Sequence, residues 1–324
     1  MHGKEEFIRG EVRHVGYIRV SHGVFRLEKP GLSDNDVFVQ ELRAWLLVLP
    51  AGAVFTHVTG ARLRGWRLPP LPEQVPVFAA VHGGNLGPRR PGLNCSRLVD
   101  AGGPSEVEVS DSGLPVDSSE EILLRAARDM GHLDLVVMLD SALALGDVDP
   151  RRMQAMVTSR RPGVRALRAA YDAARHRAES VGETLLRMFH DVMEVPVEPQ
   201  VEVRDKQGRL VGRADLLVTG TSSVHEYDGA GHRDKGQHRA DLRRERRFAG
   251  SAYVRRGYTL DDLLNHPAVA MHELDRLLCR PHQQQRLRRW RRLVDHSMYS
   301  EPGRARVMNR WRREMGIVDW ARSA

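Results

Sequence analysis

The sequence predicts a chain of mixed α+β and α/β class, and three observations lead to this prediction. The chain has 324 residues, which is enough for two or three domains. Apolar residues make up 41% and charged residues 28%, a composition that can bury a core. Short apolar runs typical of strands alternate with segments of helical periodicity.

Cysteine usage and the first residues exclude several classes of protein. Only Cys95 and Cys279 are present, which rules out a disulfide scaffold and a four-cysteine zinc site. The N-terminus is charged and lacks the apolar core of a signal peptide. The longest uncharged stretch, 44–61, contains Pro50 and predicts a helix, a turn and a second element rather than a membrane span. We therefore expect a cytoplasmic protein with no membrane partner.

The first half is predicted to consist of short elements. Strand formers around the turn 21–23 predict a hairpin over 14–27, and residues 35–49 predict a helix that ends before Pro50. The segment 69–116, rich in glycine and proline, predicts short strands joined by loops.

Helix signals then follow one another closely. Ser118-x-x-Glu121 predicts a capping box at the first of two helical patterns within 117–145. Pro150 starts a further short helix, which the residues 161–163 end.

The second half predicts the element order α-β-β-β-α-β. The predicted elements are one amphipathic helix over 164–193, strands over 201–204, 209–218 and 224–227, a helix over 237–249 and a strand over 252–255. A hairpin turn over 205–208 joins the first two strands, and Thr259-x-x-Asp262 caps another helix.

Four acidic residues occupy informative positions in this unit. Glu183 lies on the helix, Asp215 lies midway along the second strand, and Glu226 and Asp228 end the third strand. Glu226 and Asp228 face the same side, because residues two apart on a strand share a face. Carboxylates among apolar strand residues are costly unless they meet a metal or a cation. Three converging carboxylates (Asp215, Glu226 and Asp228) predict a Mg²⁺ site, which Mn²⁺ also suits.

This constellation resembles the very-short-patch-repair-like branch of the PD-(D/E)XK nuclease superfamily. The match covers residues 176–266 and rests on four stretches besides the acids: 180–187, 200–203, 208–215 and 241–246. The resemblance implies a restriction-endonuclease-like core that hydrolyses DNA phosphodiester bonds with Mg²⁺ or Mn²⁺, in DNA repair or in defence against foreign DNA. It implies catalytic roles for Glu183, Asp215, Glu226, Asp228 and His232.

One position departs from the superfamily pattern. Asp228 stands where the pattern has a lysine that orients or deprotonates the attacking water. The very-short-patch-repair-like branch commonly lacks this lysine, and His232 is the candidate general base in its place. In the alternative, arginines such as Arg213, Arg239 and Arg243 pair with the carboxylates. The chain would then be a non-catalytic DNA-binding regulator or antitoxin with a degenerate nuclease fold, and a protein-interaction scaffold is a third class.

The first half carries a second resemblance. Residues 22–27 and 55–66 are similar to AbiEi-type antitoxin regulators of abortive-infection systems, over about residues 10–160. Those proteins join a winged helix to an α/β domain. At most 15 residues precede the wing here, too few for a helix-turn-helix, so a winged-helix remnant is expected. His57 and Trp66 are interpreted as packing residues.

The charge distribution points to a polyanionic partner. Residues 233–313 contain 20 Arg and one Lys against nine acidic residues, a local excess of +12 in a chain of net charge +8. Such a segment is typical of nucleic-acid binding, although a solvated arginine-rich helix face explains it equally well. DNA contacts are predicted at Arg243, Arg244, Arg288, Arg289, Arg291 and Arg292.

These observations predict three consecutive segments. They are a regulator-like region over 1–160, an endonuclease-like domain over 163–268 and a basic helical tail over 269–324. In the tail, Trp290, Trp311 and Trp320 are interpreted as packing anchors. His225 and His238 could support the site residues from behind, but they are interpreted as surface positions.

Overall fold

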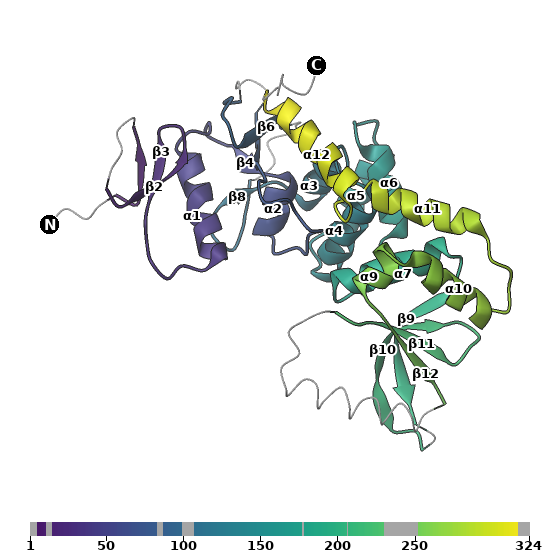
Figure 1. Cartoon of the computed structure of the whole chain (residues 1–324). Helices are drawn as coiled ribbons and strands as arrows, with labels where there is room; N and C mark the ends of the chain where they lie inside the picture. Colours follow the sequence, from purple (N-terminus) through teal and green to yellow (C-terminus); the bar gives the residue numbers. More distant parts are fainter. Residues whose placement is uncertain are drawn as a thin grey trace. The chain divides into compact units, whose positions relative to one another are not determined.

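The computed structural model describes residues 5–10, 15–82, 87–98, 107–176, 178–205, 207–229 and 252–316. Within these residues the chain is α+β, with several separate sheets (Figure 1). Unit 1 comprises Met1–Met130, Val148–Leu167 and Arg304–Ala324, and unit 2 comprises Gly131–Asp147 and Arg168–Gly303. Both compact units are thus discontinuous in sequence. The division into the segments 1–160, 163–268 and 269–324 was based on resemblance to protein families. It remains a prediction.

Unit 1 starts with a three-stranded antiparallel sheet and a helix. The strands are β1 (Phe7–Arg9), β2 (Tyr17–Ser21) and β3 (Val24–Leu27), in the order β1-β3-β2. The hairpin predicted here is confirmed by the pairing of β2 with β3. Helix α1 (Asp34–Leu46) follows, and Ser33 and Asp36 form a reciprocal cap at its start.

A five-stranded mixed sheet forms the centre of unit 1. In spatial order its strands are β6 (Leu93–Arg97), β5 (Val77–Val81), β4 (Val54–Phe55), β8 (Pro115–Val116) and β7 (Glu108–Val109). The short strands expected within 69–116 are therefore confirmed. The neighbouring helices are α2 (His57–Leu63), α3 (Ser119–Ala126) and α5 (Pro150–Thr158).

Aromatic rings fill the core of unit 1. His57 stacks on Phe78 with ring centroids 4.2 Å apart, and Trp311 meets Phe78 edge-on at 5.2 Å. Trp66 is buried as well. The packing interpretation is confirmed for His57, Trp66 and Trp311, whereas Trp320 lies outside the described residues.

The single helix predicted over 164–193 is wrong, because the chain forms two helices there. They are α6 (Val164–Ala173) and α7 (Val181–Val192). Ser180 interrupts the helix, since its hydroxyl accepts a hydrogen bond from the backbone N–H of Glu183 at 3.1 Å and thereby caps α7. The backbone N–H of Arg175 donates to buried Asp140 of α4 (His132–Ala144) at 2.6 Å instead of continuing α6.

A four-stranded sheet organises unit 2. Its strands are β9 (Val197–Arg204), β10 (Leu210–Val218), β11 (Ser223–Tyr227) and β12 (Val254–Tyr258), in the order β12-β11-β10-β9. Strands β9, β10 and β11 form an antiparallel meander, and β12 lies parallel to β11. β9 begins four residues before the predicted strand and includes Pro199, which pairs with Leu216. The helix predicted over 237–249 lies outside the described residues.

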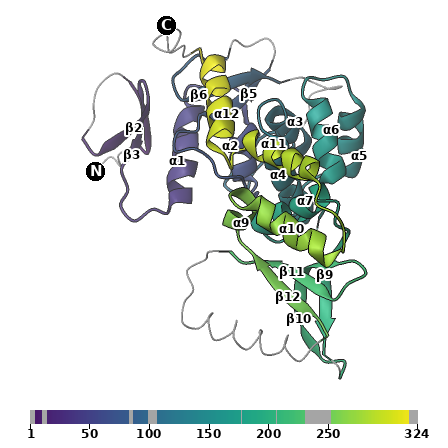
Figure 2. The ribbon, with the colours of Figure 1, turned by 45° about the vertical axis from the view of Figure 1, so that its right-hand side comes forward.

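Helices cover one side of this sheet. The elements that follow β12 are α9 (Leu260–Leu264), α10 (Pro267–Leu277), α11 (Gln284–Asp295) and α12 (Glu301–Glu314), of which the end of α12 belongs to unit 1. In both views α7, α9 and α10 lie along the same side of the four strands (Figures 1 and 2). Trp290 is fully buried and donates to the carbonyl of Leu263 at 2.7 Å, so its predicted packing role is confirmed. None of the helices in the described ranges is long and apolar enough to span a membrane.

Candidate functional site

Asp215 and Glu226 lie on neighbouring antiparallel strands. Leu216 pairs with His225, and continuing this register places Asp215 opposite Glu226. Directly opposed residues of an antiparallel pair lie on the same face of the sheet. The Asp215 carboxylate accepts a hydrogen bond from the backbone N–H of Tyr227 at 2.9 Å. The Asp215 side chain therefore reaches the end of β11.

Glu226 and Asp228 are joined by a cation that the sequence analysis did not identify. Arg255 donates from Nε to Glu226 Oε2, and from Nη2 to Asp228 Oδ1 at 2.9 Å. The Glu226 side chain is only 4% exposed, whereas those of Asp228 and Arg255 are 33% and 25% exposed. Arg255 comes from β12, the parallel neighbour of β11. One guanidinium group thus binds two carboxylates, one on the adjacent strand β11 and one on the residue directly after it.

Two glycines provide the space for this arrangement. A Cβ atom at Gly257 would lie 1.8 Å from Asp228 Oδ2, so only glycine lets that carboxylate lie over β12. A Cβ atom at Gly182 would lie 2.1 Å from the ring of Tyr227. This second glycine allows the first turn of α7 to lie against the end of β11.

Glu183 lies in that first turn of α7. Its carboxylate accepts hydrogen bonds from the backbone N–H of Glu179 at 2.8 Å and from the side-chain amide of Gln200 at 3.0 Å. It is half-buried. These contacts orient Glu183 along the start of the helix, and Arg213 pairs with Glu179 next to it.

Several predicted residues fall outside the described part of the chain. They are His232, the candidate base, and the arginines Arg239, Arg243 and Arg244. Their roles stay predictions.

The carboxylates of Asp215, Glu226 and Asp228 are of the type that binds divalent cations, but they are not arranged as a metal site. Across the described residues, no group of three or more His, Cys, Asp or Glu side chains is gathered closely enough to hold a metal ion. Carboxylate oxygens are nevertheless the ligands that Mg²⁺ prefers. The guanidinium of Arg255 stands in for a cation between Glu226 and Asp228. Glu226 and Asp228 therefore offer two neighbouring carboxylates of the kind that Mg²⁺ binds together with water.

The prediction that His225 is a surface residue is wrong. Its ring is fully buried and accepts or donates hydrogen bonds with His190 at 2.7 Å and with Ser223 at 2.9 Å. Burial lowers the pKa of His190 to about 4 and that of His225 to about 3. The hydrogen bond between these two neutral imidazoles connects α7 to β11, the strand that also carries Glu226. His238 lies outside the described residues.

Helix α11 carries the predicted DNA-binding arginines of the tail. Its buried side is formed by Arg286, Leu287, Trp290 and Val294. The four predicted residues are all exposed: Arg288, Arg289, Arg291 and Arg292. Arg289 pairs with Glu194. The helix therefore presents a cationic face to solvent.

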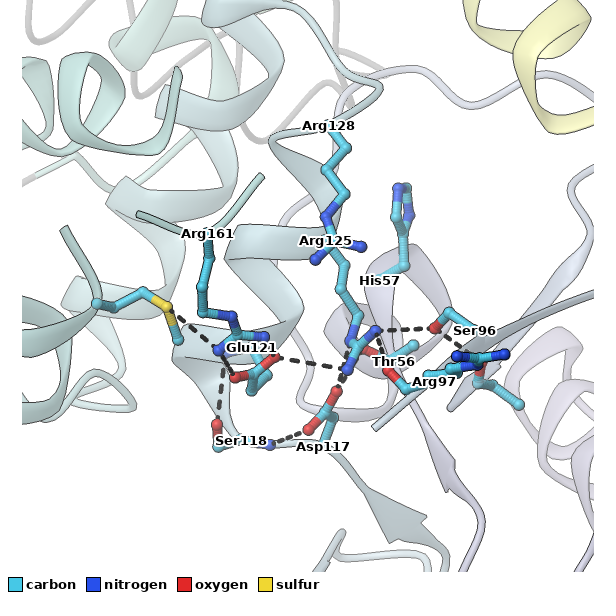
Figure 3. Close-up of polar contacts among 12 residues, drawn as sticks. Thr56, His57, Ser96, Arg97, Asp117, Ser118, Glu121, Arg125, Arg128 and Arg161 are labelled. Atoms are coloured by element: carbon cyan, nitrogen blue, oxygen red, sulfur yellow. Dashed lines mark hydrogen bonds and ion pairs between the residues drawn. The ribbon is translucent and has the colours of Figure 1, made fainter. Parts of the chain in front are cut away.

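Unit 1 contains a second cluster of arginines and carboxylates, centred on Asp117 (Figure 3). Asp117 Oδ2 accepts from Arg125 Nε at 3.0 Å and from the Thr56 hydroxyl at 2.8 Å. Arg125 also donates to the Ser96 hydroxyl at 2.8 Å. The side chains of Arg125 and Asp117 are 4% and 6% exposed, and burial raises the pKa of Asp117. Arg125 and Asp117 are thus closed off from solvent and bind each other, while Arg125 Nη2 lies 3.5 Å from Glu121 Oε2 and has no hydrogen-bond partner among the described residues.

The same cluster modifies the predicted cap of α3. Ser118 does accept from the backbone N–H of Glu121 at 3.4 Å, which confirms half of the capping box. The Glu121 carboxylate instead binds Arg161 through both oxygens, with one of the two hydrogen bonds at 2.8 Å. A bidentate charged pair is stronger than a bond to one backbone N–H.

Arg255 and Gly257 are the site residues that the sequence analysis missed. Their role depends on which strand lies beside β11, and the chain between β11 and β12 is more than 20 residues long. An arginine and a glycine two positions apart on a strand do not indicate in the sequence that this strand lies beside β11.

Comparisons with protein-family models, curated proteins and solved structures gave no match to the chain.

Proposed function

We propose that this chain is a Mg²⁺-dependent DNA endonuclease whose site lies where β10, β11 and β12 meet. The observation that carries the proposal is the cation-joined pair of Glu226 and Asp228 on the strand next to Asp215. A nearly buried carboxylate beside one that is a third exposed is expensive to maintain without a cation.

The three carboxylates have different roles in this proposal. Asp215 and Glu226 would hold Mg²⁺, with Asp228 as a further ligand. Glu226 is fixed by burial, and Asp215 by the N–H of Tyr227, so both are positioned before substrate binds. Bound Mg²⁺ supplies positive charge to the phosphate and activates water for attack. Glu183 would position these ligands from α7, and His232 is the candidate general base.

DNA binding would depend on the cationic face of α11. Arginine side chains bind phosphate oxygens without reading sequence, and they release counterions when they do so. Arg288, Arg291 and Arg292 are exposed on one helix, as such contacts require.

The test is a cleavage assay with supercoiled plasmid. Wild-type protein should nick or linearise the plasmid with Mg²⁺ or Mn²⁺ and not with EDTA. Asp215→Asn and Glu226→Gln should each lower the rate by at least about 10², the scale of losing a group that stabilises charge at the reacting centre. The matched control is Glu202→Gln, an exposed acid of β9 that pairs with Arg204 of its own strand. This variant should cleave like wild type.

The second candidate is a DNA-binding regulator without catalysis. One observation favours it: Arg255 already compensates the charge of Glu226 and Asp228. In that case, wild-type protein would bind DNA yet leave duplex, single-stranded and mismatched substrates intact with every divalent cation tested. Glu226→Gln would then not change its function.

A further inference from the structure

The guanidinium of Arg255 occupies the space between two predicted metal ligands. Its Nε binds Glu226 and its Nη2 binds Asp228, so one guanidinium group donates hydrogen bonds to both carboxylates. Glu226 lies near the end of β11 and Asp228 directly follows that strand, and their negative charges repel at this separation. The arginine places positive charge between the two carboxylates, which favours their lying side by side.

Exposure distinguishes this arrangement from an ordinary buried ion pair. Glu226 is almost buried, but Arg255 and Asp228 are a quarter and a third exposed. Strand β12 is the last in the order β12-β11-β10-β9, so Arg255 extends from an end strand of the described sheet. A long, partly exposed side chain can move into water without disturbing the core beneath it.

We propose that Arg255 is a positioning residue that holds Glu226 and Asp228 in the metal-free protein and competes with the divalent cation for them. This inference rests on the proposed function, because it takes Glu226 and Asp228 as ligands of Mg²⁺. The carboxylates cannot give their oxygens to both cations at once, so Arg255 must release at least one carboxylate when the metal binds. The arginine therefore keeps the site assembled and, at the same time, lowers its metal affinity.

The experiment measures Mn²⁺ binding by isothermal titration calorimetry, and thermal unfolding with and without Mn²⁺, for the full chain. Mn²⁺ is the probe because it accepts the same oxygen ligands as Mg²⁺. The variants are Arg255→Gln and Arg255→Lys. Arg256→Gln is the matched control, since Arg256 is the next residue of β12 and pairs with Glu273 at 3.0 Å.

Arg255→Gln should bind Mn²⁺ at least about tenfold more tightly than wild type, which corresponds to about 1.4 kcal/mol. Without metal it should melt below wild type, and Mn²⁺ should raise its melting temperature more than that of wild type. Arg256→Gln should bind Mn²⁺ like wild type. A merely structural arginine would lower stability without raising metal affinity.

Other outcomes separate the two proposals. Equal or weaker Mn²⁺ binding by Arg255→Gln, with clear binding by wild type, overturns the competition and leaves the metal site standing. Absence of Mn²⁺ binding in both proteins overturns the metal site and the competition with it. If Arg255→Gln does not fold, Arg255→Lys decides. Its ammonium is a single point charge without the fork, so its Mn²⁺ affinity should lie above that of wild type.

Discussion

Unit 1 and unit 2 both place arginine against neighbouring carboxylates, but the exposure of the charged groups differs. In unit 1, Asp117 and Glu121 face Arg125 and Arg161, which gives one guanidinium for each carboxylate. Hydroxyl groups add further hydrogen bonds, and the centre of the cluster is buried. Each carboxylate of this network therefore has a guanidinium as its partner.

In unit 2, Glu226 and Asp228 share one arginine, and Asp215 lies on the next strand. Part of this group is exposed, since the side chains of Asp228 and Arg255 are 33% and 25% exposed. The difference teaches that an arginine beside a carboxylate is not itself evidence of function. The informative feature is the access of solvent to the charged groups.

The largest expected effect comes from removing the central arginine of unit 1. Arg125→Met should lower the free energy of unfolding by about 3–5 kcal/mol, because it leaves buried Asp117 without its cation. Urea unfolding measures this loss. The control is Arg152→Met, since Arg152 is 66% exposed and pairs with Glu108, and less than about 1 kcal/mol is expected. Equal effects would mean that the unit 1 cluster is not a buried network in solution.

The next effect concerns pH and the neutral imidazoles behind the acidic residues of unit 2. Burial lowers the pKa of His190 to about 4 and of His225 to about 3, below the ordinary value of 6.5. The unfolded chain therefore binds more protons below pH 6.5, and stability falls as the pH falls toward those values. Each histidine contributes up to about 1.4 kcal/mol per pH unit in this window.

Unfolding free energies at pH 7, 6 and 5 measure that slope. His225→Asn should roughly halve the contribution of the pair, because one titrating group remains. A slope that is the same in both proteins would contradict the buried, neutral state of His225.

A smaller effect is expected at the glycine that makes room for Asp228. Gly257→Ala should cost about 1–3 kcal/mol, since the new methyl group would overlap the Asp228 carboxylate and force it aside. It should also weaken Mn²⁺ binding. The control is Gly10→Ala, where a Cβ atom meets nothing within 4 Å. Unchanged Mn²⁺ affinity in Gly257→Ala would mean that Asp228 is not a ligand.

Local signals in the sequence predicted most elements of both units. The turn at Gly23, the cap at Ser118 and the cap at Thr259 depend only on neighbouring residues, and each appears where expected. The prediction of one helix over 164–193 was wrong because the apolar stripe continues across Ser180, where α7 begins. Periodicity reports the buried face and does not report a break within it.

The site was harder to predict because it depends on contacts between distant strands. The pairing of β10 with β11 follows from a short turn, so the proximity of Asp215 to Glu226 could be inferred. The pairing of β11 with β12 crosses more than 20 residues, and therefore Arg255 could not be placed. The burial of His225 likewise depends on His190 of α7, which local sequence does not reveal.

The smallest effect on stability, and the clearest on binding, is expected on α11, whose arginines face solvent rather than a carboxylate pair. Replacing Arg288, Arg291 and Arg292 with Gln should change the free energy of unfolding by no more than about 0.5 kcal/mol per residue, as for exposed positions generally. The salt dependence of duplex binding should flatten, because each lost phosphate contact removes about 0.9 from the slope of log affinity against log salt. Fluorescence anisotropy at several salt concentrations measures this slope. Arg289→Gln is the matched control: Arg289 already pairs with Glu194, so its loss should alter the slope less than any one of the other three. An unchanged slope in the triple variant would assign the cationic face of α11 to solvation, and DNA binding would then have to depend on other arginines of the chain.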